Sequence, residues 1–191
     1  MSPAAATTDT DRAAAVRSAL RALVAERGFH GASMSAVAER AGVATGTAYV
    51  HYASKDELVL AAYLESKRAL GEAAVAGIDA GDTPERRFTE LWRSAFAYLR
   101  SHRDEARFLV QVDGSPYADP FHREATEIED DPLLAAAETP DMAAMLLPLQ
   151  PEVLYELGLA PAVHLAARGT KLDEGALAMA ATGCWRAISR P

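Results

Sequence analysis

The fold of this 191-residue chain is decided by residues 28–58, GFHGASMSAVAERAGVATGTAYVHYASKDEL. Ser33 has a side chain suited to capping a helix, and apolar residues follow it at helical spacing until Gly42 interrupts them. A second short segment runs from about Ala44 to His51. A helix of about two turns, a glycine turn and another short helix together predict a helix-turn-helix.

Longer helices are expected on both sides of this motif, because helices shorter than ~12 residues are marginal on their own. The first is predicted from about Thr10 to Arg27, with Thr10 or Asp9 as its cap. One face of this helix carries Val16, Leu20, Leu23 and Val24. Ser54 and Glu57 are spaced as a capping box, which predicts another helix running to about Ala73.

The remaining sequence predicts more helices and no sheet, because Ala and Leu are abundant while β-branched and aromatic residues are few. Residues 114–151 hold six of the ten prolines, so helices there must be short or kinked. The last two helices are expected from Pro151 to about Arg168, bent at Pro161, and from about Asp173 to Ser189. We therefore predict an all-α protein of about nine helices, with a three-helix head in residues 1–55 and a body in residues 56–191.

Charge is distributed unevenly between these two parts. The whole chain has a formal net charge of −8, which by itself argues against general nucleic-acid binding. Residues 1–55 carry six basic and four acidic groups and are net +2, whereas the rest of the chain carries −10. This asymmetry favours an approach to a polyanion by the head alone.

Several classes of protein are disfavoured by the sequence. No apolar run approaches the ~18 residues of a membrane span, and the polar N-terminus lacks the pattern of a signal peptide, so a cytoplasmic protein is expected. The single cysteine, Cys184, excludes an intrachain disulfide and a cysteine-cluster metal site. An enzyme built as a helical carboxylate bundle would need Glu-x-x-His pairs, and the sequence contains none. We therefore expect no enzymatic activity, no cofactor and no metal.

The head resembles the N-terminal domain of the tetracycline-repressor (TetR) family over about 45 residues. The matching elements are the Gly28-Phe29 pair after the first helix, the Ser33 cap, the Ala-Gly-Val run ending at Val43, the Thr-x-Tyr-x-His pattern of residues 47–51, and the Ser-Lys-x-x-Leu pattern of residues 54–58. The resemblance implies a transcriptional regulator that binds double-stranded DNA as a homodimer and responds to a small-molecule ligand. Two other hypotheses remain: a helix-turn-helix regulator controlled by a protein partner, and an all-helical enzyme.

The resemblance assigns DNA contacts to the motif and its flanks. The expected DNA-binding residues are Ser33, Ser35, Thr45, Gly46, Thr47, Tyr49, His51 and Lys55. Short threonine side chains suit base edges and phosphates, whereas Tyr49, His51 and Lys55 are expected at phosphates. Tyr49 could instead be a core aromatic residue, although Tyr52 matches the packed aromatic of the family better, and His51 and Lys55 could simply face solvent.

The sequence also departs from the family in the head. Ala44 stands where a serine cap is usual, so Thr45 is the alternative cap for the second helix of the motif, and Ala36 replaces an acid that would complete a capping box with Ser33. No Lys or Arg lies between Arg40 and Lys55. Few cations mean few neutralised phosphates, so one head alone should bind DNA weakly.

The resemblance implies a dimer formed by the last two helices. The expected interface residues are Leu154, Leu157, Leu177, Ala181, Cys184, Trp185 and Ile188. The alternative is that these residues form an ordinary core within one chain. Symmetric dimers are the commonest oligomers, and two-fold symmetry would match a palindromic operator.

The body of the family encloses a ligand cavity. Candidate lining residues are Trp92, Phe96, Phe108, Tyr117, Phe121, Tyr155 and His164. The alternative for each is plain core packing, which is the commoner role of aromatic side chains. The acidic run from Glu124 to Asp131 could face a cationic ligand or a metal, but a solvated surface is the commoner role of such runs.

Overall fold

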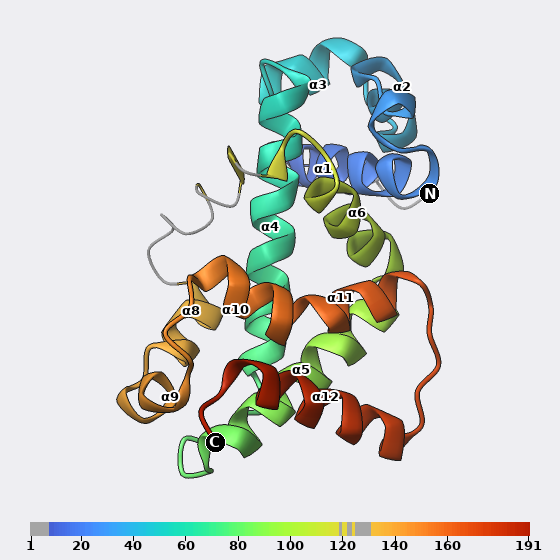
Figure 1. Ribbon diagram of the computed structural model, residues 1–191. Coiled ribbons are helices and arrows are strands. Elements are labelled where there is room, and N and C mark those ends of the chain that lie inside the picture. The colour runs from blue at the N-terminus through green and yellow to red at the C-terminus, as the bar shows by residue number, and fades with distance from the viewer. Residues whose placement is uncertain (1–7, 119, 122–123, 125–130) are drawn as a thin grey trace, which may run out of the picture. The chain divides into compact units, whose positions relative to one another are not determined.

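The computed structural model describes residues 8–118, 120–121, 124 and 131–191 (Figure 1). This part of the chain contains eleven α-helices, one short 3-10 helix and no strand, which confirms the all-α prediction. The contacts between residues divide the chain into two compact units, Met1–Glu65 and Ser66–Pro191. The boundary between the units lies within helix α4 (Lys55–Val75), whereas the sequence places it at the start of this helix.

The first unit holds α1 (Asp9–Arg27), the 3-10 helix η1 (Phe29–Gly31), α2 (Met34–Ala41), α3 (Thr45–His51) and the first half of α4. Helix α1 begins with a capping box, in which the Asp11 N–H donates to Thr8 Oγ1 (3.2 Å) and the Thr8 N–H donates to Asp11 Oδ2 (3.0 Å). The predicted cap, Thr10 or Asp9, is therefore wrong. Only Thr8 has an acid three residues later that can return the hydrogen bond.

The core of the first unit forms around the predicted apolar face of α1. The buried residues of α1, α2 and α3 are Val16, Ala19, Leu20, Leu23, Val24, Met34, Val37, Ala38 and Ala48. Helix α4 adds the buried residues Leu58, Val59, Ala62 and Tyr63. One of the two bonds of the predicted capping box forms at its start, where the Glu57 N–H donates to Ser54 Oγ (3.1 Å). The second bond does not form, because the Glu57 carboxylate accepts from the Ala53 N–H and not from that of Ser54.

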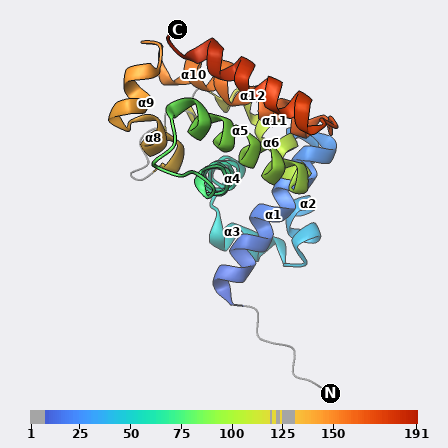
Figure 2. The same ribbon diagram turned by 90° about the horizontal axis from the view of Figure 1, so that it is seen from below.

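The second unit is built around α5 (Pro84–Ser101), which contacts α11 (Ala160–Ala167) and α12 (Glu174–Ile188). Figures 1 and 2 both show α5 and α12 side by side. The other helices of this unit are α6 (Arg103–Asp113), α8 (Pro132–Ala137), α9 (Pro140–Met145) and α10 (Pro151–Gly158). Thr83 caps α5 through the Arg86 N–H (3.4 Å), and Pro84 occupies the first turn of the helix.

The helix predicted from Pro151 to Arg168 with a bend at Pro161 is interrupted close to that proline, and the structure divides it into α10 and α11. Pro161 lies in the first turn of α11. A proline there has no N–H for the carbonyl four residues earlier and clashes with it, so the helix ends before Pro161 and begins again. This division, together with short α8 and α9 in the proline-rich segment, raises the number of described helices above the predicted nine.

The C-terminal end of the chain is joined to the segment that follows α9. Leu146 and Ser189 form an isolated antiparallel bridge. The Leu147 N–H donates to the Ile188 carbonyl and the Arg190 N–H donates to the Met145 carbonyl, both over 2.8 Å. The residues after α12 are therefore held by backbone hydrogen bonds.

Candidate nucleic-acid interface

The turn between α2 and α3 depends on glycine. Gly42 lies in the left-handed region (φ 70°, ψ 27°), which favours glycine because it has no Cβ. The Gly42 N–H donates to the Glu39 carbonyl (3.1 Å) and the Val43 N–H donates to the Ala38 carbonyl (3.0 Å). These bonds close the end of α2 and set the direction in which the chain enters α3.

Helix α3 buries one side and exposes the other. Ala48 is fully buried, whereas Thr45 and Gly46 are exposed and Thr47 is half-buried. Tyr49 is 50% exposed and Val50 is 80% exposed. Four of the expected DNA-binding residues of this helix are therefore accessible to a partner, and Val50 is a further exposed side chain that the sequence analysis missed.

The starts of α2 and α3 differ in their capping. The Ser33 hydroxyl accepts from the Ala36 N–H (3.2 Å), as predicted, and Ser33 and Ser35 are both exposed. Ala44 is the N-cap residue of α3 and makes no side-chain bond. The alternative cap, Thr45, is itself the first residue of the helix. Backbone N–H groups at the start of α3 therefore receive no side-chain cap.

His51 and Lys55 are more engaged with the protein than the exposed residues of α3. The His51 side chain is only 10% exposed, and its Nε2 lies 3.5 Å from Asp9 Oδ1 at the start of α1. The Lys55 ammonium donates a hydrogen bond to the Phe29 carbonyl at the start of η1. That acceptor is neutral, so Lys55 keeps its charge available to a phosphate.

Tyr52 is the packed aromatic residue of the head, as the sequence predicts. It is buried, and its hydroxyl accepts from Arg17 Nη1 (2.6 Å). Glu65 in turn accepts hydrogen bonds from both Arg17 and Arg21. Burial acts to raise the pKa of Glu65, but the two guanidinium groups outweigh it, and the pKa lies below its usual range.

Half of the six cations of the head are therefore already paired with acids. Arg40 is held by both carboxylate oxygens of Glu26, each over 2.7 Å, and this contact lowers the pKa of Glu26. Arg17 and Arg21 share Glu65. Of the six basic residues of the head, all of which the structure describes, Arg12 and Arg27 are the exposed ones without an ion-paired acid or a hydrogen-bonded acceptor. The formal charge of +2 of residues 1–55 thus overstates the attraction of the head to DNA.

The predicted ligand-lining residues are distributed through the second unit. Trp92, Phe96, Phe108 and Phe121 are buried, and Tyr117, Tyr155 and His164 are half-buried. Phe96 and Trp92 stack on each other with ring centroids 5.7 Å apart. Of the acidic run 124–131, residues 125–130 lie outside the described part of the chain.

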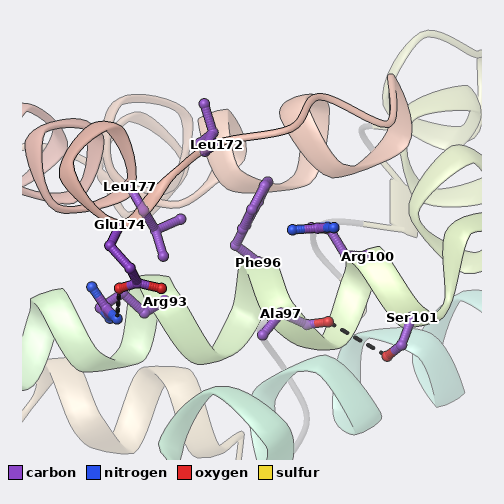
Figure 3. A pocket seen from close by; sticks show the side chains of 8 residues that line it. All are labelled: Arg93, Phe96, Ala97, Arg100, Ser101, Leu172, Glu174 and Leu177. Carbon is purple, nitrogen blue, oxygen red and sulfur yellow. Dashed lines mark hydrogen bonds and ion pairs between the residues drawn. The ribbon is translucent and has the colours of Figure 1, made fainter.

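A surface groove of about 410 Å³ lies between α5 and the start of α12. Its lining residues are Arg93, Phe96, Ala97, Arg100, Ser101, Leu172, Glu174 and Leu177 (Figure 3). Arg93 is paired with Glu174 over 2.6 Å, and the Arg100 guanidinium lies 5.8 Å from the centroid of the Phe96 ring. Phe96 is the one predicted ligand-lining residue in this groove.

The residues expected at a dimer interface fall into two groups. Ala181, Trp185 and Ile188 are buried within the second unit, where the Trp185 and Phe88 rings lie 5.5 Å apart. Leu157 is exposed, and Leu154, Leu177 and Cys184 are half-buried. Burial raises the pKa of the Cys184 thiol. The buried face of α12 is thus used within the chain, as the alternative interpretation of these residues requires.

Two further features bear on the class of the protein. No helix among the described residues is long and apolar enough to cross a membrane. No group of three or more histidine, cysteine or acidic residues in the described ranges could hold a metal ion.

Comparison with known proteins agrees with this architecture. A family model described as "Bacterial regulatory proteins, tetR family" matches residues 16–62, and one described as "Tetracyclin repressor-like, C-terminal domain" matches residues 84–189. A TetR-family transcriptional regulator from Haemophilus influenzae RD has 24% identity and a TM-score of 0.78, covering 95% of this chain and 98% of its own. A TetR family transcription regulator from Marinobacter aquaeolei VT8 has 20% identity and a TM-score of 0.77, covering 96% and 98%.

A TetR family protein from Vibrio parahaemolyticus has 26% identity and a TM-score of 0.70, covering 93% of this chain and 98% of its own. The two family models cover most of the sequence, and the helix-turn-helix and the helical C-terminal domain are both present in the structure. The chain therefore belongs to the TetR family of bacterial transcriptional regulators.

Proposed function

We propose that this protein is a homodimeric repressor that binds a palindromic operator and leaves it when a small apolar or amphipathic ligand binds the body. The observation that carries the proposal is the exposed side of α3, where Thr45, Gly46, Tyr49 and Val50 are accessible on a helix whose other side is packed. A recognition helix needs such a surface to reach base edges in the major groove. We expect the protein to act in the cytoplasm.

The chemistry of α3 suits a readout based on hydroxyl and methyl groups. Thr45 and Thr47 can donate or accept at base edges, and the Val50 methyl groups can contact the methyl group of thymine. The Tyr49 hydroxyl can reach a phosphate, and Lys55 can add a charged contact beside it. Because few cations remain unpaired in each head, we propose that tight binding requires two heads acting together.

The exposed face of α12 supports a dimer better than its buried face does. Gly175, Met179, Gly183 and Ala187 are all exposed and recur at helical spacing along α12. Small side chains allow a second helix to approach closely, and Met179 is 72% exposed. On α10, Val153 and Leu157 form a second exposed apolar pair. We propose that these residues, in place of Ala181, Trp185 and Ile188, form the contact between two copies.

Release from DNA would follow from a shift between two conformations of the dimer. In one conformation the separation of the two heads matches the spacing of the operator half-sites, and in the other it does not. A ligand that binds the second conformation more tightly lowers the population of the first, which is the one that binds DNA. The size of the shift is limited by the difference in ligand affinity between the two conformations. The half-buried Tyr117, Tyr155 and His164 are the candidate lining residues that remain accessible within the body.

The test is selection of bound sequences from random duplex DNA by the purified protein. We expect enrichment of a palindrome with two half-sites, and a Thr47→Ala variant should relax the preference at one position of each half-site. A Met179→Glu, Gly183→Glu variant should sediment as a monomer and lose the palindrome. Gln111→Glu, which adds a carboxylate at an exposed position of α6 outside the proposed contact, serves as the charge-changing control. Failure of the wild-type protein to enrich any sequence at moderate salt would contradict the proposal.

A further inference from the structure

The surface groove between α5 and the start of α12 has one lining cation that no acid neutralises. Arg93 and Glu174 pair with each other over 2.6 Å, so their charges cancel. The Arg100 guanidinium lies 5.8 Å from the centroid of the Phe96 ring, and it makes no hydrogen bond or ion pair with any residue that the structure describes. With two arginines and one glutamate among its lining residues, the groove has a net charge of +1.

An aromatic floor positions Arg100 in the groove. Phe96 and Arg100 are one helical turn apart on α5, and their side chains lie side by side in Figure 3. Phe96 is 2% exposed and stacks on the fully buried Trp92, so the ring under the guanidinium is itself held in place. A guanidinium beside an aromatic ring keeps the N–H groups of its outer edge open to a planar acceptor. The cation is thus in position before any ligand arrives.

The apolar wall of the groove comes from the turn before α12 and from the first turns of that helix. Gly169 in this turn has φ 71°, a left-handed conformation that favours glycine, and a Cβ there would lie 2.6 Å from Arg103 Nη2. The Asp173 carboxylate caps α12 by accepting from a backbone N–H over 2.8 Å. Leu172 and Leu177 therefore line the groove from a turn and a helix start that are both closed by local contacts.

We infer that this groove binds a small aromatic carboxylate, whose carboxylate group pairs with Arg100 and whose ring lies against Leu172 and Leu177. A guanidinium can donate two parallel hydrogen bonds to a carboxylate, and a single negative charge balances the +1 of the lining residues. A dianionic phosphate would exceed that charge and meet the carboxylate of Glu174, and a cationic ligand would be repelled by Arg100.

The size of the groove favours a compact ligand. Its volume of about 410 Å³ is near the lower end of the range for small-molecule sites, so a ring fits it better than a long alkyl chain. Of the residues expected to line a ligand cavity, Tyr117, Tyr155 and His164 lie outside this groove. Binding here goes beyond the proposed function, because it does not depend on whether the protein also binds an operator.

The inference is tested with 3-phenylpropionate as the probe, in calorimetric titrations of the full-length protein at pH 7. The alcohol 3-phenylpropanol and the amine 3-phenylpropylammonium are the neutral and cationic comparisons. We expect the carboxylate to bind the wild-type protein more tightly than either. Arg100→Met should weaken 3-phenylpropionate by about tenfold, since charged hydrogen bonds are lost, and should change 3-phenylpropanol by less than about twofold. Equal affinity of the wild-type protein for the three probes would overturn the inference.

Arg86→Met is the matched control for this experiment. Arg86 lies on the same helix as Arg100, its side chain is 74% exposed, and it does not line the groove. Its loss should change the affinity for 3-phenylpropionate by less than about twofold, because it removes the same charge without removing the proposed contact. Equal losses of affinity in Arg86→Met and Arg100→Met would show that the probe responds only to net charge, and would overturn the inference.

A charge placed inside the groove gives an independent test that keeps Arg100. Ala97 is exposed, lines the groove and lies three residues before Arg100 on α5. Ala97→Glu puts a carboxylate where it competes for the guanidinium, whereas Ala97→Gln adds a side chain of similar size without the charge. We expect Ala97→Glu to bind 3-phenylpropionate several-fold more weakly than Ala97→Gln. Equal affinities of these two variants would contradict a contact between the bound carboxylate and Arg100.

A last measurement uses the wild-type protein alone. In NMR spectra of the complex, the ring protons of bound 3-phenylpropionate should show nuclear Overhauser effects to the methyl groups of Leu172 and Leu177, since these side chains form the apolar wall.

Two outcomes of the experiments on the wild-type protein would overturn the inference. The first is a bound probe whose ring protons contact only methyl groups outside the groove. The second is a protein that binds none of the three carboxylates benzoate, phenylacetate and 3-phenylpropionate.

Discussion

The two units of the protein both pair arginines with acids, but they differ in how large a share of their basic side chains is paired. In the head, Arg17 and Arg21 share Glu65, and Arg40 is held by Glu26, so three of six cations are already neutralised by acids. In the body, which is acidic overall, Arg100 has no ion-paired acid among the described residues. The formal charge of a region therefore does not give the charge that it can offer to a partner. The head is less basic than its sequence suggests, and the acidic body holds an available cation.

The largest loss of stability is expected when the buried aromatic ring that contacts the paired cations of the head is removed. Tyr52→Ala deletes the buried ring that lies under Arg17, and we expect a loss of roughly 3–5 kcal/mol in the free energy of unfolding. Tyr49→Ala is the matched control, because Tyr49 is 50% exposed and its loss should change stability by less than about 0.5 kcal/mol. Urea unfolding followed by circular dichroism measures both. Equal stabilities of the two variants would contradict the assignment of Tyr52 to the core.

A smaller loss is expected when the shared acid is neutralised. Glu65→Gln leaves Arg17 and Arg21 without their carboxylate, and because all three side chains are partly exposed we expect about 1–2 kcal/mol in the free energy of unfolding. Glu72→Gln breaks an exposed pair with Arg68 and should cost no more than about 0.5 kcal/mol. The two variants are compared by urea unfolding. A Glu65→Gln protein as stable as Glu72→Gln would show that the paired cations of the head contribute nothing measurable.

Salt dependence distinguishes an available cation from a neutralised one within the head. Lys55 donates to a neutral carbonyl, whereas Arg40 is held by a carboxylate. We expect Lys55→Ala to weaken operator binding almost uniformly across sequences and to flatten the plot of log K against log salt by about one unit per head. Arg40→Ala should leave the slope nearly unchanged. If the two slopes fall equally, pairing within the head does not determine which cations reach phosphates.

The smallest effect concerns an ion pair of the body at low pH. The hydrogen bond from Arg87 lowers the pKa of Asp141 from 3.8 to about 2. A carboxylate with a lowered folded-state pKa stabilises the protein above its unfolded-state pKa, and this contribution is lost as the pH falls from 3.8 toward 2. Thermal unfolding of Asp141→Asn between pH 5 and pH 2 should therefore show a flatter pH dependence than the wild-type protein. Parallel curves would contradict the role of this pair.

The sequence predicts the head far better than the body because the head carries strong local signals. Ser33 and Gly42 each act through a hydrogen bond or backbone angle within a few residues, and both are found where they were expected. The cap of α1 was predicted wrongly because Thr8, Asp9 and Thr10 are adjacent and each has a side chain that can cap a helix. Only the reciprocal bond with Asp11 distinguishes them.

The site residues that the sequence analysis missed depend on contacts between distant segments. Met179 was missed because α12 is rich in alanine, and its composition does not distinguish the exposed face from the face that buries Trp185. Val50 was missed because an apolar side chain does not by itself indicate an exposed position.

The bridge between Leu146 and Ser189 makes a closed loop of the last part of the chain. Backbone hydrogen bonds join Met145 to Arg190, so α10, α11 and α12 lie between two points that are held together. The ends of this loop cannot separate without breaking both bonds, and the amide protons of Leu147 and Arg190 should therefore exchange with solvent at similar rates, in one opening event. Removing the last three residues would delete the Arg190 bond to Met145 and leave only the Leu147 bond to Ile188 to hold the loop closed.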